Sequence, residues 1–259
     1  MQKKRSTSTE RPEPTSGGAV RIQKFLAEVG IASRRAIEEM VLLGQVEVNG
    51  EVVTKLPCFV TPGEDEIVVD GRRISRRRRA EEKVYFLLNK PRNVVCTSRD
   101  PQGRPKAVDY LPPIKQRVYT VGRLDADSSG LILLTNDGEL TQHLTHPSGE
   151  VAKTYIVTVD GSVDENQINR LKRGLYLDGK RTVGAGVRVE SRGPERTMLR
   201  ITLREGRNRE IRRMLVRLGH NVHRLKRVAI GPITDKGLGV GQMRTLSPKE
   251  VKSLRDAGH

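Results

Sequence analysis

Near the start of the chain, the pattern of hydrophobic positions predicts two short helices. Between residues 22 and 29 the apolar side chains recur every three or four positions, and Gly30 is suited to end that helix. Ser33 can cap a second helix, which Gly44 would terminate. The apolar stripes of these helices comprise Ile22, Phe25, Leu26 and Val29 in the first and Ile37, Met40 and Val41 in the second.

The pattern then changes to the period of two that is typical of strands. Residues 46–48 and 51–53 flank Asn49-Gly50, a dipeptide that strongly predicts a tight hairpin. Another strand is expected over residues 67–69, before a turn at Asp70-Gly71. The pattern therefore predicts a small unit over residues 19–74, with two helices on a small sheet.

After Lys83 the pattern mixes strands with helices. Four strands are expected, over residues 84–88, 131–134, 154–159 and 198–203. One helix is expected after residue 205, with a buried stripe of Ile211, Met214, Leu215 and Leu218 and an end at Gly219. Because the strands outnumber the helices without regular alternation, we expect an α+β domain over residues 84–259, with a mixed, largely antiparallel sheet flanked by helices.

Two segments lack any such period. Residues 1–18 are rich in Ser, Thr, Pro, Lys and Arg, and we expect them to be a disordered tail. Residues 75–83 contain four consecutive arginines, Arg76 to Arg79, whose mutual repulsion predicts an open basic linker. This linker either lies near RNA or is simply solvated.

Charge narrows the choice of partner. The 259 residues include 48 Lys and Arg against 31 Asp and Glu, a formal net charge of +17. Such a surplus favours a nucleic acid partner over a membrane surface, since no long basic amphipathic helix is evident. Aromatic residues make up only 3% of the chain, so recognition should depend on phosphate contacts, on shape and on one extruded base rather than on a broad stacking platform.

The rest of the composition predicts a cytoplasmic protein that binds no metal, and a monomer is the default because no feature of the sequence indicates the oligomeric state. No stretch of about 18 apolar residues is present, and the first residues lack the apolar segment of a secretory leader. Cys58 and Cys96 lie far apart, which favours reduced thiols. His143 with His146 and His220 with His223 have helical spacing, but no third ligand joins either pair.

Arg34 and Arg35 break a local rule. They fall in the first turn of the second predicted helix, where the helix dipole disfavours cations. A bound phosphate would reverse that balance, because helix N-termini attract anions. We favour RNA binding here over side chains that simply extend into water.

Two polar segments can carry chemistry. The loop 122–130, before a buried strand, can hold Asp125 on a rigid support, although aspartates in loops more often cap turns. In the segment 205–215, Arg212 lies at the border of the buried stripe and could pair with a carboxylate. Arginines on an amphipathic helix can equally form a solvated basic face.

The first unit resembles the RNA-binding domain named after ribosomal protein S-four. The resemblance is carried by Arg21–Leu26, by Ala32-Ser33-Arg34-Arg35 and by Val48-Asn49-Gly50. It implies two helices packed on a small sheet, with the Arg34-Arg35 helix facing RNA.

The second unit contains four motifs in one order: Tyr85–Pro91, Gly122–Asp125, Lys153–Tyr155 and Gly206–Met214. Together they are similar to the pseudouridine synthase family that modifies bacterial ribosomal RNA. The resemblance covers about residues 21–254 and implies isomerisation of uridine to pseudouridine without a cofactor. One residue, Glu210, departs from the glutamine that is usual in the family, which leaves one local polar contact open.

The resemblance also implies residue roles. Asp125 would be the catalytic carboxylate, Tyr155 would stack on the target base, and Arg212 would pair with Asp125. The basic residues expected to contact RNA in this unit are Lys90, Arg123, Arg207, Arg209 and Arg213. For Lys90, positioning of the loop and plain exposure are alternatives.

Several alternatives stay open at the level of sequence. Asp127 could be a second acid, although capping of the loop or contact with RNA is favoured. The RNA substrate is expected to be large-subunit ribosomal RNA, with small-subunit RNA as the alternative. A non-catalytic RNA-binding protein of ribosome assembly is the rival function, and Asp125 discriminates between the two.

Overall fold

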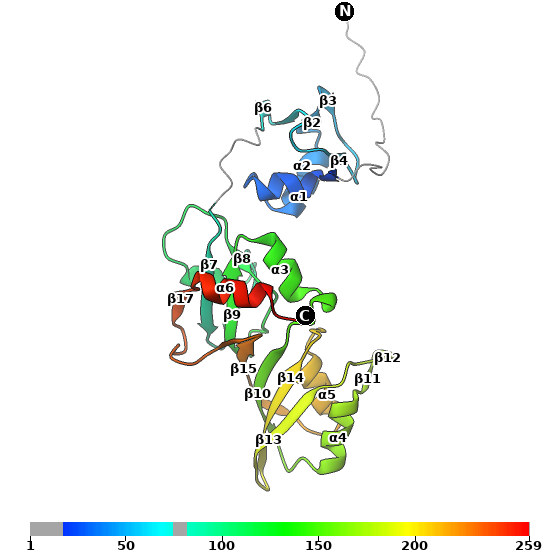
Figure 1. Ribbon diagram of the computed structural model, residues 1–259. Helices are drawn as coiled ribbons and strands as arrows, with labels where there is room; N and C mark the ends of the chain where they lie inside the picture. Colours follow the sequence, from blue (N-terminus) through cyan, green and yellow to red (C-terminus); the bar gives the residue numbers. More distant parts are fainter. Residues whose placement is uncertain (1–17, 75–81, 259) are drawn as a thin grey trace, which may run out of the picture. The chain divides into compact units, whose positions relative to one another are not determined.

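The computed structural model describes residues 18–74 and 82–258 (Figure 1). The chain divides into two compact units, Met1–Glu82 and Lys83–His259, and each is described by itself. The disordered tail and the arginine-rich linker predicted from the sequence lie outside the described residues, apart from Gly18, Glu82 and Lys83. Within the described part of the chain, no helix has the length and apolar character needed to cross a membrane.

The first unit packs two helices on a small antiparallel sheet, as predicted. Its elements are β1 (Val20–Arg21), α1 (Ile22–Glu28), α2 (Arg34–Leu42), β2 (Val46–Val48), β3 (Glu51–Val52), β4 (Phe59–Val60), β5 (Ile67–Val69) and β6 (Arg72–Arg73). Four strands form a sheet in the order β3-β2-β5-β6, and β1 pairs with β4. The apolar faces of α1 and α2 meet those of β2 and β5 in one core.

Local signals in this unit act as expected. The Ser33 hydroxyl accepts a hydrogen bond from the Ala36 N–H at 3.1 Å and so caps α2. The turn between β2 and β3 has positive φ at both Asn49 (53°) and Gly50 (79°), the conformation of the tight turns that suit hairpin twist. The predicted hairpin and helix start are therefore confirmed.

The second unit is built on one nine-stranded mixed sheet, in the order β13-β14-β10-β15-β9-β7-β17, with β16 beside β15 and β8 beside β9. Its strands are β7 (Tyr85–Lys90), β8 (Tyr119–Thr120), β9 (Ser129–Thr135), β10 (Lys153–Asp160), β13 (Gly186–Arg192), β14 (Arg196–Leu203), β15 (Val222–Ile230), β16 (Ile233–Thr234) and β17 (Met243–Thr245). The pair β15–β9 is parallel, whereas the other pairs in this sheet are antiparallel. The predicted mixed, largely antiparallel sheet is confirmed.

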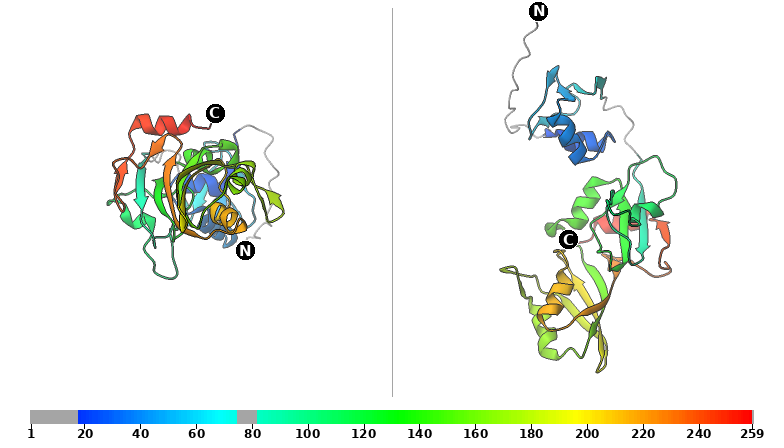
Figure 2. Two further views of the ribbon diagram at one scale, coloured as in Figure 1. Left: turned by 90° about the horizontal axis from the view of Figure 1, so that it is seen from below. Right: turned by 180° about the vertical axis from the view of Figure 1, so that it is seen from behind.

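Helices cover both halves of this sheet. They are η1 (Ala107–Tyr110), α3 (Gly138–Thr145), η2 (Pro147–Gly149), α4 (Glu165–Arg173), α5 (Glu210–Arg217) and α6 (Pro248–Arg255), and a small separate hairpin is formed by β11 (Tyr176–Leu177) and β12 (Lys180–Arg181). From opposite sides of the molecule, α4 and α5 are seen on the same face of β13, β14 and β10 (Figures 1 and 2).

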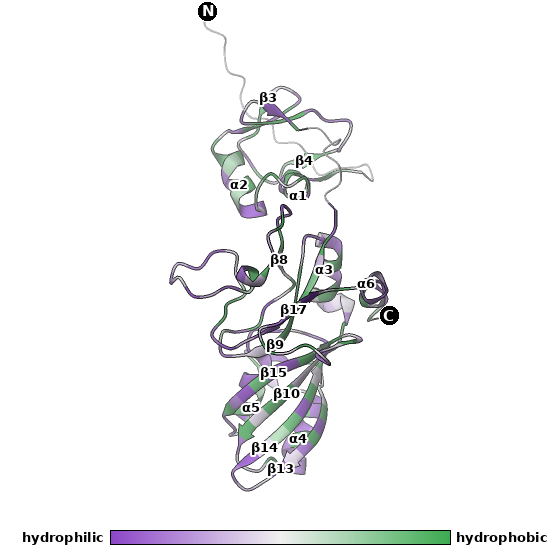
Figure 3. Cartoon of the chain, turned by 90° about the vertical axis from the view of Figure 1, so that its left-hand side faces the viewer, coloured by the Kyte–Doolittle hydropathy of each residue, from purple (hydrophilic) through white to green (hydrophobic). Residues whose placement is uncertain are grey.

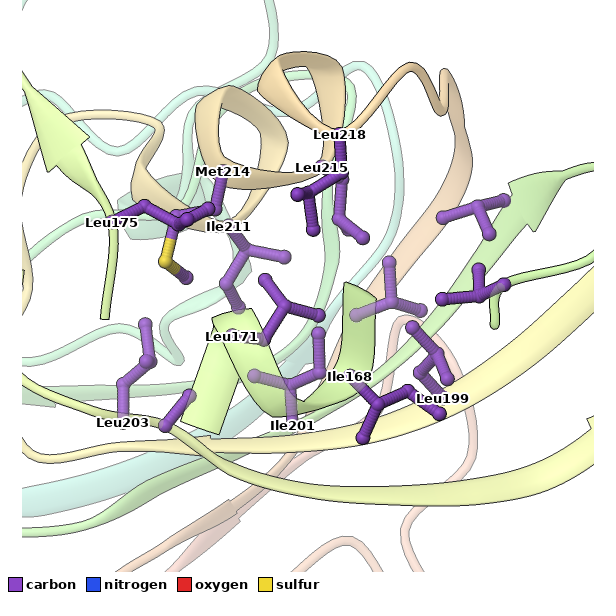
Figure 4. Packing of buried hydrophobic residues seen from close by; sticks show 14 of the residues in the cluster. Ile168, Leu171, Leu175, Leu199, Ile201, Leu203, Ile211, Met214, Leu215 and Leu218 are labelled. Carbon is purple, nitrogen blue, oxygen red and sulfur yellow. The ribbon is translucent and has the colours of Figure 1, made fainter. Parts of the chain in front are cut away.

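Two of the three cores of this unit pack α-helices onto the sheet. In one, Ile168 and Leu171 of α4 and Met214 and Leu215 of α5 pack on strand residues such as Ile201 (Figure 4). In the other, α3 and α6 pack on alternate residues of β7 and β9. The remaining residues of β9 face a further core on the opposite side, which explains its uninterrupted apolar sequence.

The central strand β15 was not predicted from the sequence. Its sequence, Val222–Ile230, carries four basic side chains and only scattered apolar ones, so it lacks the apolar run expected of a central strand. Figure 3 shows hydrophilic and hydrophobic residues mixed along β10 and β14 as well. On these strands one face packs against α4 and α5, and the other carries mostly polar side chains together with Ile156 and Met198.

Candidate active site

The loop between β8 and β9 holds Asp125 in a defined place. Leu124 is buried in the core beneath the loop. The Ser128 N–H donates to the Asp125 carbonyl at 3.1 Å, and the Asn93 N–H donates to the Ala126 carbonyl at 2.6 Å. Because backbone groups fix the loop at several points, the carboxylate at its centre is presented on a rigid support.

Asp125 faces an arginine of the next motif. Its side chain is 28% exposed, and Oδ2 lies 3.2 Å from Nη1 of Arg209. The same Nη1 lies 3.4 Å from Oδ2 of Asp127. Arg209 precedes α5 with left-handed dihedral angles (φ 48°, ψ 33°), a conformation that costs an arginine about 1 kcal/mol. We conclude that α5 and the Asp125 loop are joined through Arg209.

Arg212 is partly buried, as expected, but its partner differs from the prediction. Its side chain is 11% exposed, and Nη2 lies 3.2 Å from Oδ2 of Asp127 rather than beside Asp125. The guanidinium also donates to the Ser128 hydroxyl at 3.3 Å and to the Val222 carbonyl at 3.1 Å. Because α5 places Arg212 under the C-terminal part of the loop, Asp127 is the carboxylate within its reach.

Burial changes the acidity of this arginine. It lowers the pKa of Arg212, whereas the charge of Asp127 acts in the opposite direction. A guanidinium stays protonated even so. Asp127 is thus a structural counter-ion, which favours the loop-holding role considered from the sequence over that of a second acid.

A cavity of about 380 Å³ opens beside Asp125, within the size range of small-ligand clefts. Its apolar wall consists of Tyr155, Leu203, Ile211 and Leu225, and its charged rim includes Asp125, Arg209 and Arg212. Tyr155, on β10, is half-buried and packs against the cores on both sides of it. Its ring therefore combines the two alternatives from the sequence, packing in the core and facing the site.

Lys90 does not contact RNA as expected, because its side chain is completely buried. Its ammonium donates to the carbonyls of Pro91 at 2.9 Å and Val94 at 2.8 Å. Burial lowers the pKa of Lys90, while the nearby Cys96, Asp125 and Asp127 act in the opposite direction. Since residues 91–94 include the N–H that binds the Asp125 loop, Lys90 positions that loop.

The other predicted arginines differ in how they are held. Arg207 donates through Nε to Glu205 at 3.0 Å and through Nη2 to the Arg181 carbonyl at 2.7 Å, so it fastens its loop to β12. Arg213 pairs with Asp178 at 2.5 Å.

Six of the predicted site residues line this one cavity: Asp125, Tyr155, Arg212, Arg123, Arg207 and Arg209. Lys90 and Arg213 are not among the lining residues. Arg34 and Arg35 belong to the first unit, where both are exposed in the first turn of α2. The sequence motifs thus converge in space within the second unit.

Gly130 and Arg227 were not singled out from the sequence, although both support the site. A Cβ on Gly130 would lie 2.2 Å from the Arg227 carbonyl, so only glycine lets β9 approach β15 this closely. The buried Arg227 donates through Nε to the Leu131 carbonyl at 2.6 Å. In the sequence, a glycine directly before an apolar strand was the one sign that another strand approaches closely at this position.

With this geometry in place, the chain can be compared with known proteins. It is similar to a solved pseudouridylate synthase, with a TM-score of 0.66 and 32% identity over 91% of this chain and 99% of that one. The fold is therefore that of a pseudouridylate synthase. The sequence model of the RNA pseudouridylate synthase family matches residues 84–216, and that of the S4 domain matches residues 20–67. The chain belongs to the RNA pseudouridylate synthase family.

Its relatives carry more specific names. Ribosomal large subunit pseudouridine synthase B of Bacillus subtilis is 44% identical over 91% of this chain and 95% of its own length. The protein of the same name from Salmonella typhimurium is 40% identical over 91% of this chain and 82% of its own length.

Proposed function

We propose that the protein converts a specific uridine of large-subunit ribosomal RNA to pseudouridine, with Asp125 as the catalytic carboxylate. The position of Asp125 carries this proposal, because it lies on a rigid loop, at a cavity with an aromatic wall, beside Arg209. The names of the two similar synthases support ribosomal RNA as the substrate. We also propose that the protein acts as a monomer in the cytoplasm.

The reaction requires a carboxylate and a means of turning the base. The N1–C1′ bond breaks, the uracil turns and the C5–C1′ bond forms, while C5 loses a proton and N1 gains one. All other atoms are conserved. An ionised Asp125 can attack the sugar carbon C1′ covalently or remove a proton from C2′. The guanidinium of Arg209 lies 3.2 Å from the carboxylate and holds it in place at the cavity.

The uridine must leave its stack before this chemistry can begin. Extrusion of a base costs a few kcal/mol, and less in a loop or bulge than in a duplex. The Tyr155 ring on the cavity wall can offset part of that cost by stacking on the uracil. Arg123 and Arg209, both exposed at the rim, are placed to bind the phosphates that flank the extruded nucleotide.

The experiment is a pseudouridine map of ribosomal RNA from cells that lack the protein. We expect one or a few large-subunit positions to revert to uridine, and to be restored by the wild-type gene but not by Asp125→Asn. If the pseudouridine map of large-subunit RNA is unchanged in the deletion strain, the proposal that this RNA is the substrate is wrong. Restoration by the Asn variant would contradict the catalytic role of Asp125.

A further inference from the structure

A buried carboxyl group lies at the start of α5, on the wall of the cavity. Glu210 is only 3% exposed. Its Oε2 accepts a hydrogen bond from the backbone N–H of Arg207 at 3.0 Å. Its Oε1 is buried and receives no N–H or O–H from any residue that the structure describes. A buried carboxylate oxygen without a hydrogen-bond donor costs free energy. The O–H of a neutral acid avoids this cost where it can donate to a neighbouring acceptor.

A second carboxyl group faces Glu210. Glu205 accepts hydrogen bonds at both oxygens, from the Val183 N–H at 2.5 Å and from Nε of Arg207 at 3.0 Å. Both oxygens of the Glu205 carboxylate thus have a hydrogen-bond donor. The carboxylate can also accept a hydrogen bond from the O–H of a protonated Glu210. Burial, and then the hydrogen bond to Glu205, raise the pKa of Glu210 to about 7, while the Arg207 N–H acts in the opposite direction.

The two carboxyl groups and Arg207 close the turn that leads into α5. Residues 206–209 form the cavity wall between them, and Arg209 at the end of this turn lies 3.2 Å from Asp125. Glu210 directly follows Arg209, and its hydrogen bond to the Arg207 N–H closes the turn that contains Arg209, so a change in that bonding alters where the Arg209 guanidinium lies.

We propose that Glu210 is a positioning residue that acts as a neutral acid: its O–H donates to Glu205, its other oxygen accepts from Arg207, and the closed turn holds Arg209 against Asp125. This inference rests on the proposed catalytic role of Asp125. Loss of the proton places the buried Glu210 carboxylate against that of Glu205, and the Arg207 guanidinium is hydrogen-bonded to Glu205 rather than to Glu210. The turn then opens, and Arg209 leaves the catalytic carboxylate.

The groups around Glu210 make the direction of the pH effect definite. On its own turn it faces Glu205 and Arg207. From the hairpin β11–β12, the backbone carbonyls of Lys180 and Arg181 accept hydrogen bonds from the Arg207 guanidinium. Since the pKa of Glu210 is raised, the neutral form predominates below about pH 7 and is lost above it. Activity that needs this form falls as the pH rises.

The test is the pH profile of kcat/KM for the full-length protein on an RNA substrate that carries the target uridine. We expect the wild type to lose about thirtyfold between about pH 6 and pH 8.5, because the neutral fraction of a group with a pKa of about 7 falls by that factor. Glu210→Gln keeps a donor and an acceptor without a titratable proton, so its profile should be flat over this range. Parallel profiles of the wild type and Glu210→Gln would overturn the proposal.

Two further variants sharpen the result. Glu205→Gln removes the neighbouring carboxylate, so the alkaline loss should move to lower pH, opposite to the effect of Glu210→Gln. Glu190→Gln removes a carboxylate that pairs with Arg200 on β14, away from the cavity, and should leave the wild-type profile unchanged. If the alkaline loss of kcat/KM stays at the wild-type pH in Glu205→Gln, the proposed hydrogen bond from Glu210 to Glu205 is wrong.

A direct titration separates this inference from the proposed function. In protein labelled with ¹³C at the glutamate carboxyl carbons, the resonance that disappears in Glu210→Gln should titrate near neutral pH. A midpoint below about pH 5 would overturn the neutral acid whether or not Asp125 is catalytic. If instead the resonance titrates near neutral pH while Asp125→Asn still makes pseudouridine, the proposed function fails and the neutral acid stands.

Discussion

At the scale of single residues, Asp127 takes most of the arginine contacts of the site. Both Arg209 and Arg212 reach its carboxylate, whereas Asp125 receives Arg209 alone among the described residues. An aspartate with one salt-bridge partner keeps free lone pairs for a substrate. In our proposal the division of work follows from this geometry: Asp127 ties the loop to α5, and Asp125 is left to react.

Replacing Arg212 should show this division. In Arg212→Met, the Asp127 carboxylate, the Ser128 hydroxyl and the Val222 carbonyl lose a shared donor. We expect kcat to fall about 100-fold, because small displacements of reacting groups carry penalties of that size. RNA affinity should change much less. Isomerisation would be measured under single-turnover conditions, with binding measured in parallel.

Arg217→Met is the matched control, because Arg217 lies exposed on the same helix. It should keep both kcat and affinity near the wild-type values. If Arg212→Met isomerises RNA within about threefold of the wild-type rate, the positioning role is wrong.

The sequence identified the residue types of the site better than their partners. The resemblance placed Asp125, Tyr155 and Arg212 in one site, and they line one cavity. The pairing of Arg212 could not be derived, since two aspartates two positions apart look alike in a loop of unknown conformation. Lys90 was misjudged because a lysine at a strand end is usually exposed, and the carbonyls that bury it come from the loop's own fold.

At the scale of elements, Asp137 connects two helices to the sheet. Its side chain is 3% exposed, caps α3 through the N–H groups of Glu139 and Leu140, and pairs with Arg255 of α6 at 2.6 Å. It also accepts a hydrogen bond from the Tyr85 hydroxyl of β7 at 2.8 Å. One carboxylate therefore joins α3, α6 and β7.

Asp137→Ala should destabilise the catalytic unit by about 2 kcal/mol, since it removes a helix cap and the hydrogen-bond partner of the Tyr85 hydroxyl and of the half-exposed Arg255. Asp164→Ala is the control, because the exposed Asp164 caps α4 alone through the Gln167 N–H. That change should cost about 1 kcal/mol. Urea unfolding followed by circular dichroism measures both, and equal losses would contradict the joint role of Asp137.

The elements that could be predicted from the sequence are those with a clear period. The strand over residues 131–134 corresponds to β9 (Ser129–Thr135), which is buried on both faces. The helix beginning after residue 205 starts only at Glu210, because residues 206–209 line the cavity. Strand β15 stayed hidden, because its place in the sheet depends on pairing with distant β9 and β10, which local pattern does not encode.

At the scale of the whole molecule, two units divide RNA binding and chemistry in our proposal. The net charge of +17 favours capture of RNA. In the first unit, Arg34 and Arg35 are both exposed at the capped start of α2, where a phosphate can use the helix N-terminus as well as the guanidinium groups.

Removing these two arginines should weaken binding without changing the chemistry. In Arg34→Ala/Arg35→Ala, we expect the slope of log affinity against log salt concentration to fall by about 2, with kcat at saturating RNA unchanged. Arg72→Ala/Arg73→Ala removes the same charge from β6 of the same unit and serves as control. If both double variants weaken binding equally, only net charge matters and the proposed phosphate site is wrong.

The central claim is that Asp125 performs the isomerisation, and the most direct measurement is the release of the C5 hydrogen of uridine. A substrate RNA labelled with tritium at C5 loses the label as the new C5–C1′ bond forms. The wild-type protein should release one tritium per target uridine. Asp125→Asn should bind the same RNA with equal affinity and release tritium at least about 1,000-fold more slowly. Release by Asp125→Asn at a rate within about tenfold of the wild type would contradict the claim.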